Sequence, residues 1–272
     1  MKQLIAGIIS VFLIIFTAGC GEDEVSVIKR TAEYGEKTVK VELPIKLNID
    51  CFCSNIEIYC WNKQEVKFEY TKSITAKMQE QKLKKYLQKM DIITDVSGSE
   101  VSFKSNCEES DKVSRVLELS IYIPYRTEEV SISCREGKLK ICDHLKCNLS
   151  VEGGILDTII NKFSGRVNAS VKKGNVRINA GKLLDGTVIS TIDGNVYVKA
   201  LYEPSGEYSF YSENGVLDIN IPKELNAKII DYLPADYYDN NTKEGFTIDT
   251  TETDTASFRL TSGVEGINVN RF

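Results

Sequence analysis

Apolar and polar residues alternate along much of the chain between positions 135 and 222. The run Val196-Tyr197-Val198 shows the pattern, with an apolar residue at every second position after a short turn. This is the period of a β-strand that buries one face. The same phrase recurs as KGNVRI (173–178), DGNVYV (193–198) and NGVLDI (214–219). A repeat of about 20 residues is typical of proteins built from stacked units.

Glycines mark the turns between these predicted strands, because glycine adopts backbone conformations that other residues avoid. We expect Gly174 and Gly194 to occupy equivalent turn positions with positive φ in consecutive repeats. The full set of predicted turn positions is Gly137, Gly154, Gly165, Gly174, Gly186, Gly194, Gly206 and Gly215. A short strand cannot bury an apolar face alone, so the repeats are expected to stack. The alternative is a meander of hairpins, since the same turn residues also join antiparallel strands. The even spacing favours stacking.

The sequence therefore predicts an all-β protein, a parallel β-solenoid with one inserted helix and irregular caps. The helix is expected near residues 76–90, where apolar residues recur every three or four positions. The predicted divisions are a signal peptide (1–19), a lipidated tether (20–35), N-terminal strands with the helix and first rungs (36–125), glycine-rich solenoid repeats (126–222) and a C-terminal cap (223–272).

The first residues have the character of an export signal. The apolar run from Leu4 to Phe16 is shorter than the roughly 20 residues of a membrane-spanning helix. The sequence Thr17-Ala18-Gly19-Cys20 that follows resembles the lipobox of bacterial lipoproteins. The resemblance implies cleavage before Cys20 and a lipid on its sulfur, which would hold the protein on the extracytoplasmic face of the cell membrane. An ordinary secretory signal is the alternative.

The net charge and the composition of the chain argue against several classes of function. The chain has 34 basic and 39 acidic residues and a formal net charge of −5. With no basic domain, we expect no nucleic-acid partner. We find no phosphate-binding loop, no Ser/His pair and no catalytic cysteine context, and we expect no cofactor.

Cysteines are frequent for a chain without an obvious disulfide framework. Besides Cys20 they are Cys51, Cys53, Cys60, Cys107, Cys134, Cys142 and Cys147. Most share the parity of core apolar residues, so we expect buried thiols. Disulfides are an alternative, because exported proteins are often oxidised. A zinc site built from Cys142, His144 and Cys147 would lack standard spacing, and we expect no metal.

The order of several motifs resembles the DUF4097 family. Those motifs are Ile56 to Trp61, then Val66 to Tyr70, a helix, Leu119 to Pro124, and glycine-rich rungs that end in Ile219 to Pro222. Members of this family are described as proposed adhesins with β-strand repeats. The resemblance covers roughly residues 45–270. It implies a β-solenoid with a surface role, and it carries over no catalytic residues.

The predicted function is that of a non-catalytic surface module, an adhesin or envelope interaction protein. We expect Arg177, Tyr197 and Lys199 to form a face that contacts an envelope protein or a wall polysaccharide. The wider outward row is Arg166, Asn168, Asn175, Arg177, Asn195, Tyr197 and Lys199. The simpler alternative is that this row is only solvated strand surface.

A different class of function is a polysaccharide-acting β-helix enzyme, either a lyase or a hydrolase. Its candidate acids are Asp157, Asp185, Asp193 and Asp218. Asp185 and Asp193 directly precede glycine, where turn chemistry alone favours aspartate. The run Gly153-Gly154-x-x-Asp157 matches half of a calcium-binding repeat, but it does not recur.

Overall fold

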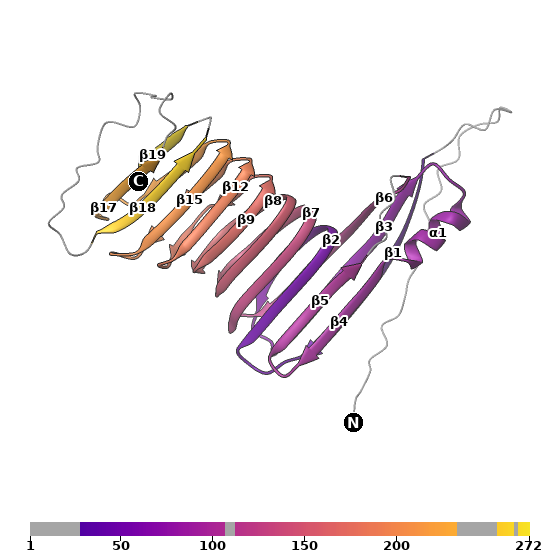
Figure 1. Ribbon diagram of the computed structural model, residues 1–272. Coiled ribbons are helices and arrows are strands. Elements are labelled where there is room, and N and C mark those ends of the chain that lie inside the picture. The colour runs from indigo at the N-terminus through magenta and orange to yellow at the C-terminus, as the bar shows by residue number, and fades with distance from the viewer. Residues whose placement is uncertain (1–27, 107–111, 233–254, 264–265) are drawn as a thin grey trace.

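The computed structural model describes residues 28–106, 112–232, 255–263 and 266–272. Almost all of this part of the chain is β-strand, with one short helix. The strands lie side by side along the long axis of the molecule, from β1, β3 and α1 at one end to β17, β18 and β19 at the other (Figure 1). They form a large, mostly parallel sheet that is not closed into a barrel.

The elements of the N-terminal part are β1 (Lys29–Lys40), β2 (Ile45–Trp61), β3 (Glu65–Ala76), α1 (Glu80–Gln88), β4 (Asp91–Ser97), β5 (Glu100–Asn106) and β6 (Ser114–Pro124). The long strands of the middle are β7 (Thr127–Lys146) and β8 (Asn148–Gly165). The shorter strands that follow are β9 (Val167–Lys173), β10 (Val176–Ile178), β11 (Gly181–Leu183), β12 (Thr187–Asp193), β13 (Val196–Lys199), β14 (Leu201–Tyr202), β15 (Glu207–Asn214) and β16 (Leu217–Ile221). The last strands are β17 (Ala227–Tyr232), β18 (Ala256–Ser262) and β19 (Ile267–Arg271).

Antiparallel pairing is confined to the N-terminal end of the described chain. Strand β3 pairs antiparallel with both β1 and β6, and β4 pairs antiparallel with β5. Strand β2 links this end to the rest, because it pairs in parallel with β5, β6 and β7.

From β7 onwards every strand pair is parallel. One series runs β8, β9, β12, β15, β18, and a second runs β8, β10, β13, β16, β19. A third, shorter series runs β8, β11, β14. Up to β16, each strand thus pairs with a segment about 20 residues away, which is the period of the sequence repeat. The last steps, from β15 to β18 and from β16 to β19, join Glu207 to Ser257 and Leu217 to Ile267. The described strands of residues 126–222 therefore do not form the hairpin meander considered as an alternative.

The alternation of apolar and polar residues along each strand produces the hydrophobic core. Inward residues such as Val176, Ile178, Val196 and Val198 are fully buried, and the outward residues between them are partly or fully exposed. One apolar cluster continues from Val41 in the N-terminal part to Ile267 in β19. Parallel pairing in register brings like positions of successive strands together, so a single pattern of residues builds a continuous column.

Helix α1 is shorter than the predicted 76–90 segment. Strand β3 continues to Ala76, where it still pairs with Lys29 of β1, and the helix begins only at Glu80. Its apolar stripe, Leu83 and Leu87, is buried in a separate small cluster beside Ile74 of β3. The helix therefore covers the N-terminal end of the stack.

The described residues after Pro222, in the predicted C-terminal cap, lie mostly in strands. They form β17, β18 and β19, which continue the parallel series of β15 and β16. Residues 233–254 lie outside the described chain.

Candidate functional site

Outward-facing side chains of successive strands form a row across the second series. Lys140 of β7, Ile159 of β8, Arg177 of β10, Tyr197 of β13 and Asp218 of β16 stand in register, each beside the next. Neighbouring strands are roughly 4.8 Å apart. The row is therefore a line of closely spaced side chains on one surface, set by register alone.

Two members of the predicted binding face touch each other within this row. The guanidinium carbon of Arg177 lies 4.1 Å from the centroid of the Tyr197 ring, a cation–π contact. Contacts of this kind contribute about 0.5–1 kcal/mol at exposed sites, and they hold both side chains in place. Lys199, two residues further along β13, has its ammonium nitrogen 5.1 Å from the ring centroid of Phe272.

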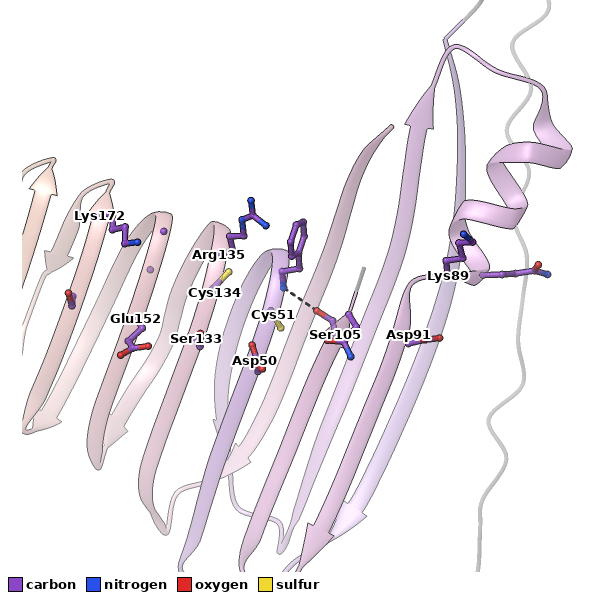
Figure 2. A pocket seen from close by; sticks show the side chains of 16 residues that line it. Asp50, Cys51, Lys89, Asp91, Ser105, Ser133, Cys134, Arg135, Glu152 and Lys172 are labelled. Atoms are coloured by element: carbon purple, nitrogen blue, oxygen red, sulfur yellow. Dashed lines mark hydrogen bonds between the residues drawn. The ribbon is translucent and has the colours of Figure 1, made fainter. Parts of the chain in front are cut away.

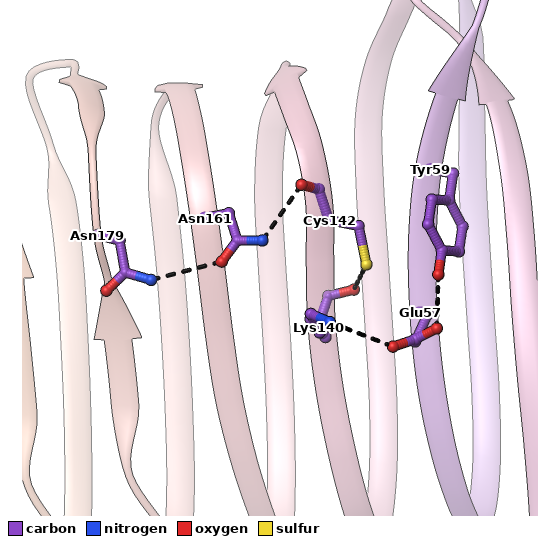
Figure 3. Close-up of polar contacts among 6 residues, drawn as sticks. All are labelled: Glu57, Tyr59, Lys140, Cys142, Asn161 and Asn179. Atoms are coloured by element: carbon purple, nitrogen blue, oxygen red, sulfur yellow. Dashed lines mark hydrogen bonds and ion pairs between the residues drawn. The ribbon is translucent and has the colours of Figure 1, made fainter.

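The same face carries a polar network closer to β2 (Figure 3). The Tyr59 hydroxyl donates to a carboxylate oxygen of Glu57 at 2.6 Å, and the Lys140 ammonium lies 3.5 Å from the other oxygen of Glu57. The hydrogen bond to Glu57, followed by desolvation, raises the pKa of Tyr59. Further along, the Asn179 amide donates to the Asn161 amide oxygen at 3.4 Å, and Asn161 donates to the Cys142 carbonyl oxygen at 3.2 Å.

Aromatic rings extend this network towards β6. Tyr122 stacks on Tyr59 with ring centroids 5.1 Å apart, and Trp61 lies 5.4 Å from Tyr122. The Lys63 ammonium sits 4.5 Å above the Trp61 ring. Sequence reasoning did not find Glu57, Tyr59 and Tyr122 as part of the face, because only the parallel pairing of β2 with β6 and β7 brings them there.

The predicted outward row does not lie on one surface. Asn168 belongs to β9, in the first series, whereas Arg177 belongs to β10, in the second. Alternation breaks between the two strands, where Lys172 and Lys173 are both exposed in succession, so the chain turns a corner. Arg166 also lies away from the face, directly before β9, where its Nε donates to the Asp185 carbonyl oxygen at 2.7 Å.

Asparagine side chains stabilise these corners, the turns at which the chain passes from a strand of the first series to a strand of the second. The backbone N–H of Asn195 donates to the side-chain oxygen of Asn175 at 2.9 Å, and the N–H of Val216 donates to the side-chain oxygen of Asn195 at 2.8 Å. The Asp157 carboxylate accepts in the same way from the backbone N–H of Asn175, at 2.9 Å. These residues satisfy backbone donors of the next repeat, a common role of Asp and Asn side chains at turns.

The four candidate catalytic acids each have structural partners. Besides Asp157, the Asp185 carboxylate accepts from the backbone N–H of Glu207 at 2.7 Å, and Asp193 accepts from the Asn214 amide at 2.7 Å. Asp218 accepts from the amides of Asn220 and Asn270, each at 3.0 Å. The candidates lie on different strands and turns. Asp157, the acid of the partial calcium motif, lies at a corner. Its hydrogen bonds to Asn175 give it a structural role there.

The predicted turn glycines are not equivalent in φ. Positive φ is found at Gly137, Gly165, Gly174 and Gly186, but not at Gly154, Gly194, Gly206 and Gly215. The expectation of matching positive φ at Gly174 and Gly194 is therefore wrong. What Gly174, Gly194 and Gly215 share is close approach of backbones. A Cβ on each would collide with a carbonyl oxygen of the preceding repeat, namely that of Leu156, Gly174 and Gly194 respectively.

The described cysteines are free thiols, and most are buried. The buried ones are Cys51, Cys60, Cys134 and Cys147, while Cys53 and Cys142 are half-buried. Desolvation raises the pKa of Cys51 to about 11 and that of Cys60, Cys134 and Cys147 to about 12. Cys20 and Cys107 lie outside the described residues.

No group of three or more His, Cys, Asp and Glu side chains within the described chain is arranged to hold a metal ion. Of the considered zinc ligands, His144 instead lies 2.9 Å from the hydroxyl of Ser164 through its Nε2. Cys147 is buried and Cys142 is half-buried.

A broad groove of about 970 Å³ opens on the opposite side of the corner (Figure 2). It is lined by residues from the end of α1 and the start of β4, from the end of β5, and from β2, β7, β8 and β9. The side chains that line it include three acids and three bases, namely Asp50, Asp91, Glu152, Lys89, Arg135 and Lys172. Sequence reasoning missed this groove, because its residues come from strands up to 122 positions apart in the chain, from Asp50 to Lys172.

The helix content bears on membrane crossing only for the described residues. In that part, the single helix is neither long nor apolar enough to cross a bilayer. The predicted lipidation site, Cys20, lies outside it.

Comparison with known proteins gives structural neighbours only. No protein-family model matches the chain, so the resemblance to the DUF4097 family stays a prediction, and no curated protein matches. The chain is similar to the structure of a "putative cell adhesion protein" from Clostridium sporogenes, with 13% identity, a TM-score of 0.32 and coverage of 88% of this chain and 100% of that one.

Two further neighbours are a "putative adhesin" from Bacteroides fragilis and one from Parabacteroides distasonis. Each has 12% identity and a TM-score of 0.41, covering 88% of this chain and 97% of the other. Structural similarity at these TM-scores does not indicate what this chain binds.

Proposed function

We propose that the protein is a non-catalytic surface module of the adhesin or envelope-interaction type, anchored to the membrane by a lipid on Cys20. The observation that supports it best is the in-register row Lys140–Ile159–Arg177–Tyr197–Asp218. It is a regular, rigid surface with charges of both signs and an aromatic ring fixed by a cation–π contact. Arginine and tyrosine are the residue types that dominate the energetics of protein-binding surfaces.

The proposal includes a β-solenoid architecture. Up to β16, three series of parallel strands advance by about one sequence repeat per step. Winding of this kind presents like positions of every repeat on the same side of the molecule. Membership in the DUF4097 family is part of the same proposal, and it implies no catalytic residues.

Binding is tested with the full chain in detergent, against envelope proteins and purified wall polysaccharides, by pull-down followed by titration calorimetry. The test variant replaces Arg177, Tyr197 and Lys199 with alanine. The matched control replaces the same residue types where they are exposed elsewhere, namely Tyr211 and Arg259 on β15 and β18 of the first series and Lys228 on β17, which pairs with β18.

We expect a ligand that binds the test variant at least tenfold more weakly than the natural chain and binds the control variant equally well. Equal affinity of both variants for every captured ligand would remove the proposed face. A parallel screen for polysaccharide turnover addresses the enzyme class, and turnover that Asp157→Asn, Asp193→Asn or Asp218→Asn abolishes would overturn the non-catalytic proposal.

The lipid anchor is tested separately. Mass spectrometry of the membrane fraction should find a mature chain that begins at a lipidated Cys20. A Cys20→Ser variant should leave that fraction, because one or more acyl chains would no longer hold it. Full membrane retention of the Cys20→Ser variant would contradict the anchor.

A further inference from the structure

A second pocket lies on the third series of strands, away from the row of the proposed function. Lys146 at the end of β7, Ser164 near the end of β8 and Lys182 of β11 stand in register, and all three line it. Both lysines are exposed and Ser164 is half-buried. Neighbouring strands are roughly 4.8 Å apart, so the Ser164 side chain lies between the two lysines. The row therefore presents a hydroxyl group with a positive charge on either side.

The single histidine of the chain contacts this row. His144 precedes Lys146 by two residues on β7, and both side chains are exposed. The His144 Nε2 lies 2.9 Å from the Ser164 hydroxyl oxygen. When Nε2 carries the proton, it donates to that oxygen, and the hydroxyl hydrogen of Ser164 is left to donate to a ligand. Ser164 is thus oriented by His144 and offers a donor to the pocket.

The pocket is positively charged, although the whole chain has a net charge of −5. Its described lining carries two lysines and His144 against one carboxylate, that of Glu128. The Lys182 ammonium also lies 3.7 Å from a carboxylate oxygen of Glu203, and both of these side chains are partly exposed. Ion pairs between exposed side chains contribute little to stability, so Lys182 can exchange this partner for a bound anion.

These groups match a phosphate better than a carboxylate. Bidentate recognition of a carboxylate is typical of arginine, whereas lysine binds phosphate as a point charge. Within the described chain, no arginine lines this pocket. A phosphate placed over Ser164 accepts one hydrogen bond from the hydroxyl and one from each flanking ammonium, because the flexible lysine stems let both ammonium groups converge there.

The pocket has room for more than a phosphate. Its volume of about 560 Å³ lies in the range of small-molecule sites. Beyond the row it is lined by Glu128 and Asn148, whose side-chain oxygens accept hydrogen bonds from hydroxyl groups, and by Leu184. A ligand that fills the pocket therefore carries a phosphate at one end and hydroxyl groups at the other.

We propose that this pocket binds a polyol phosphate. The phosphate lies against Ser164 between Lys146 and Lys182, and the polyol hydroxyls contact Glu128 and Asn148. Bare phosphate leaves the Glu128 carboxylate without a donor, and a neutral polyol leaves both ammonium groups without an anion. The site shares no residue with the row of the proposed function and does not depend on it.

The experiment titrates the full chain in detergent by calorimetry with glycerol 3-phosphate, a monoester, and with glycerophosphoglycerol, a diester. Inorganic phosphate and glycerol are the control ligands, because each carries one half of the proposed chemistry. The test variants are Lys146→Met, Lys182→Met and Ser164→Ala. The matched controls, Lys228→Met on β17 and Ser209→Ala on β15, make the same changes at positions of the same exposure class.

We expect at least one ester to bind more tightly than phosphate and glycerol. A tighter monoester identifies the ligand as a soluble phosphate ester, and a tighter diester identifies it as a unit of a headgroup or polymer. Each lysine variant should weaken ester binding about tenfold or more, and each control variant less than about twofold. Ser164→Ala should weaken it by a smaller factor. Glu203→Gln should leave the affinity unchanged or raise it, because Lys182 loses a competing carboxylate.

Absence of ester binding, or unchanged affinity in both lysine variants, would overturn the proposal. Phosphate or glycerol that binds as tightly as both esters would also overturn it, since one half of the ligand would then contribute nothing. The variant that replaces Arg177, Tyr197 and Lys199 with alanine should bind the ester as the natural chain does. Loss of ester binding in that variant would place the ligand on the other face and overturn the assignment to this pocket.

Discussion

The hydroxyl of Thr191 donates a hydrogen bond to the carbonyl oxygen of Gly174, 3.1 Å away on the preceding repeat. Thr191 is 1% exposed, so this bond forms inside the stack. The same relationship recurs along the molecule in Ser212 to Gly194 at 2.7 Å and Ser262 to Gly215 at 3.2 Å. A small hydroxyl residue and a glycine therefore act together at each corner, where backbones approach too closely for a larger residue.

Thr191→Val should lower the free energy of unfolding by about 1–2 kcal/mol, because the Gly174 carbonyl loses its buried donor while side-chain shape is kept. The matched control is Thr158→Val. Thr158 is equally buried at 1% exposure, but its hydroxyl has no hydrogen-bond partner. The control should therefore be neutral or slightly stabilising. Chemical denaturation of both variants measures the difference, and equal losses would contradict the role of the Thr191 bond.

Gly194→Ala should destabilise the protein by about 1–3 kcal/mol, because the added methyl group meets the Gly174 carbonyl oxygen. The control is Gly98→Asn in the turn between β4 and β5. Gly98 has φ +61, which asparagine tolerates, and the nearest heavy atom to an added Cβ is 3.8 Å away. Its cost should stay below about 1 kcal/mol. A thermal melt that shows no loss for Gly194→Ala would remove the close-approach explanation.

The sequence predicts the features of the fold that depend on short segments of chain. It does not predict the features that depend on contacts between distant segments. The apolar parity of Val176 and Val196 and the 20-residue spacing predict strands that stack, since both are properties of short segments. The separation of Asn168 from Arg177 is not local in that sense. It depends on the direction in which the chain continues after the corner at residues 172–175, and Gly174 predicts a turn there but not that direction. The groove depends on which strand lies beside β2, and that register is set by distant core contacts.

Stability should fall as the pH rises above about 8.5, the usual pKa of a thiol in an unfolded chain. Burial raises the pKa of Cys134 and Cys147 to about 12 in the folded state. Between these values the unfolded chain has released the thiol proton and the folded chain still holds it. The folded state binds more protons, so each such group costs up to about 1.4 kcal/mol per pH unit.

The measurement compares unfolding free energies at pH 8.5 and pH 10 for the natural chain and for Cys147→Ala. The variant should lose less stability over this interval, whatever its stability at neutral pH. Ser133→Ala is a control that removes no titrating group, and its pH slope should equal that of the natural chain. An unchanged slope in Cys147→Ala would show that this thiol does not stay protonated in the fold.

Asn195 tests whether the corner hydrogen bonds stabilise the stack. Its side-chain oxygen accepts from the backbone N–H of Val216 at 2.8 Å. Asn195→Ala should cost about 0.5–1.5 kcal/mol at every pH, because that donor loses its partner. Asn195→Asp keeps the acceptor and should be close to neutral at pH 7.

A carboxylate that accepts a backbone N–H has a lowered pKa in the folded state. The Asn195→Asp variant should therefore keep its stability above about pH 3.9, the usual pKa of aspartate, and lose it progressively as the pH falls further. Denaturation curves from pH 7 to pH 2.5, read as differences from the natural chain, measure this effect. If Asn195→Asp and Asn195→Ala lose the same free energy at pH 7, the acceptor contributes nothing.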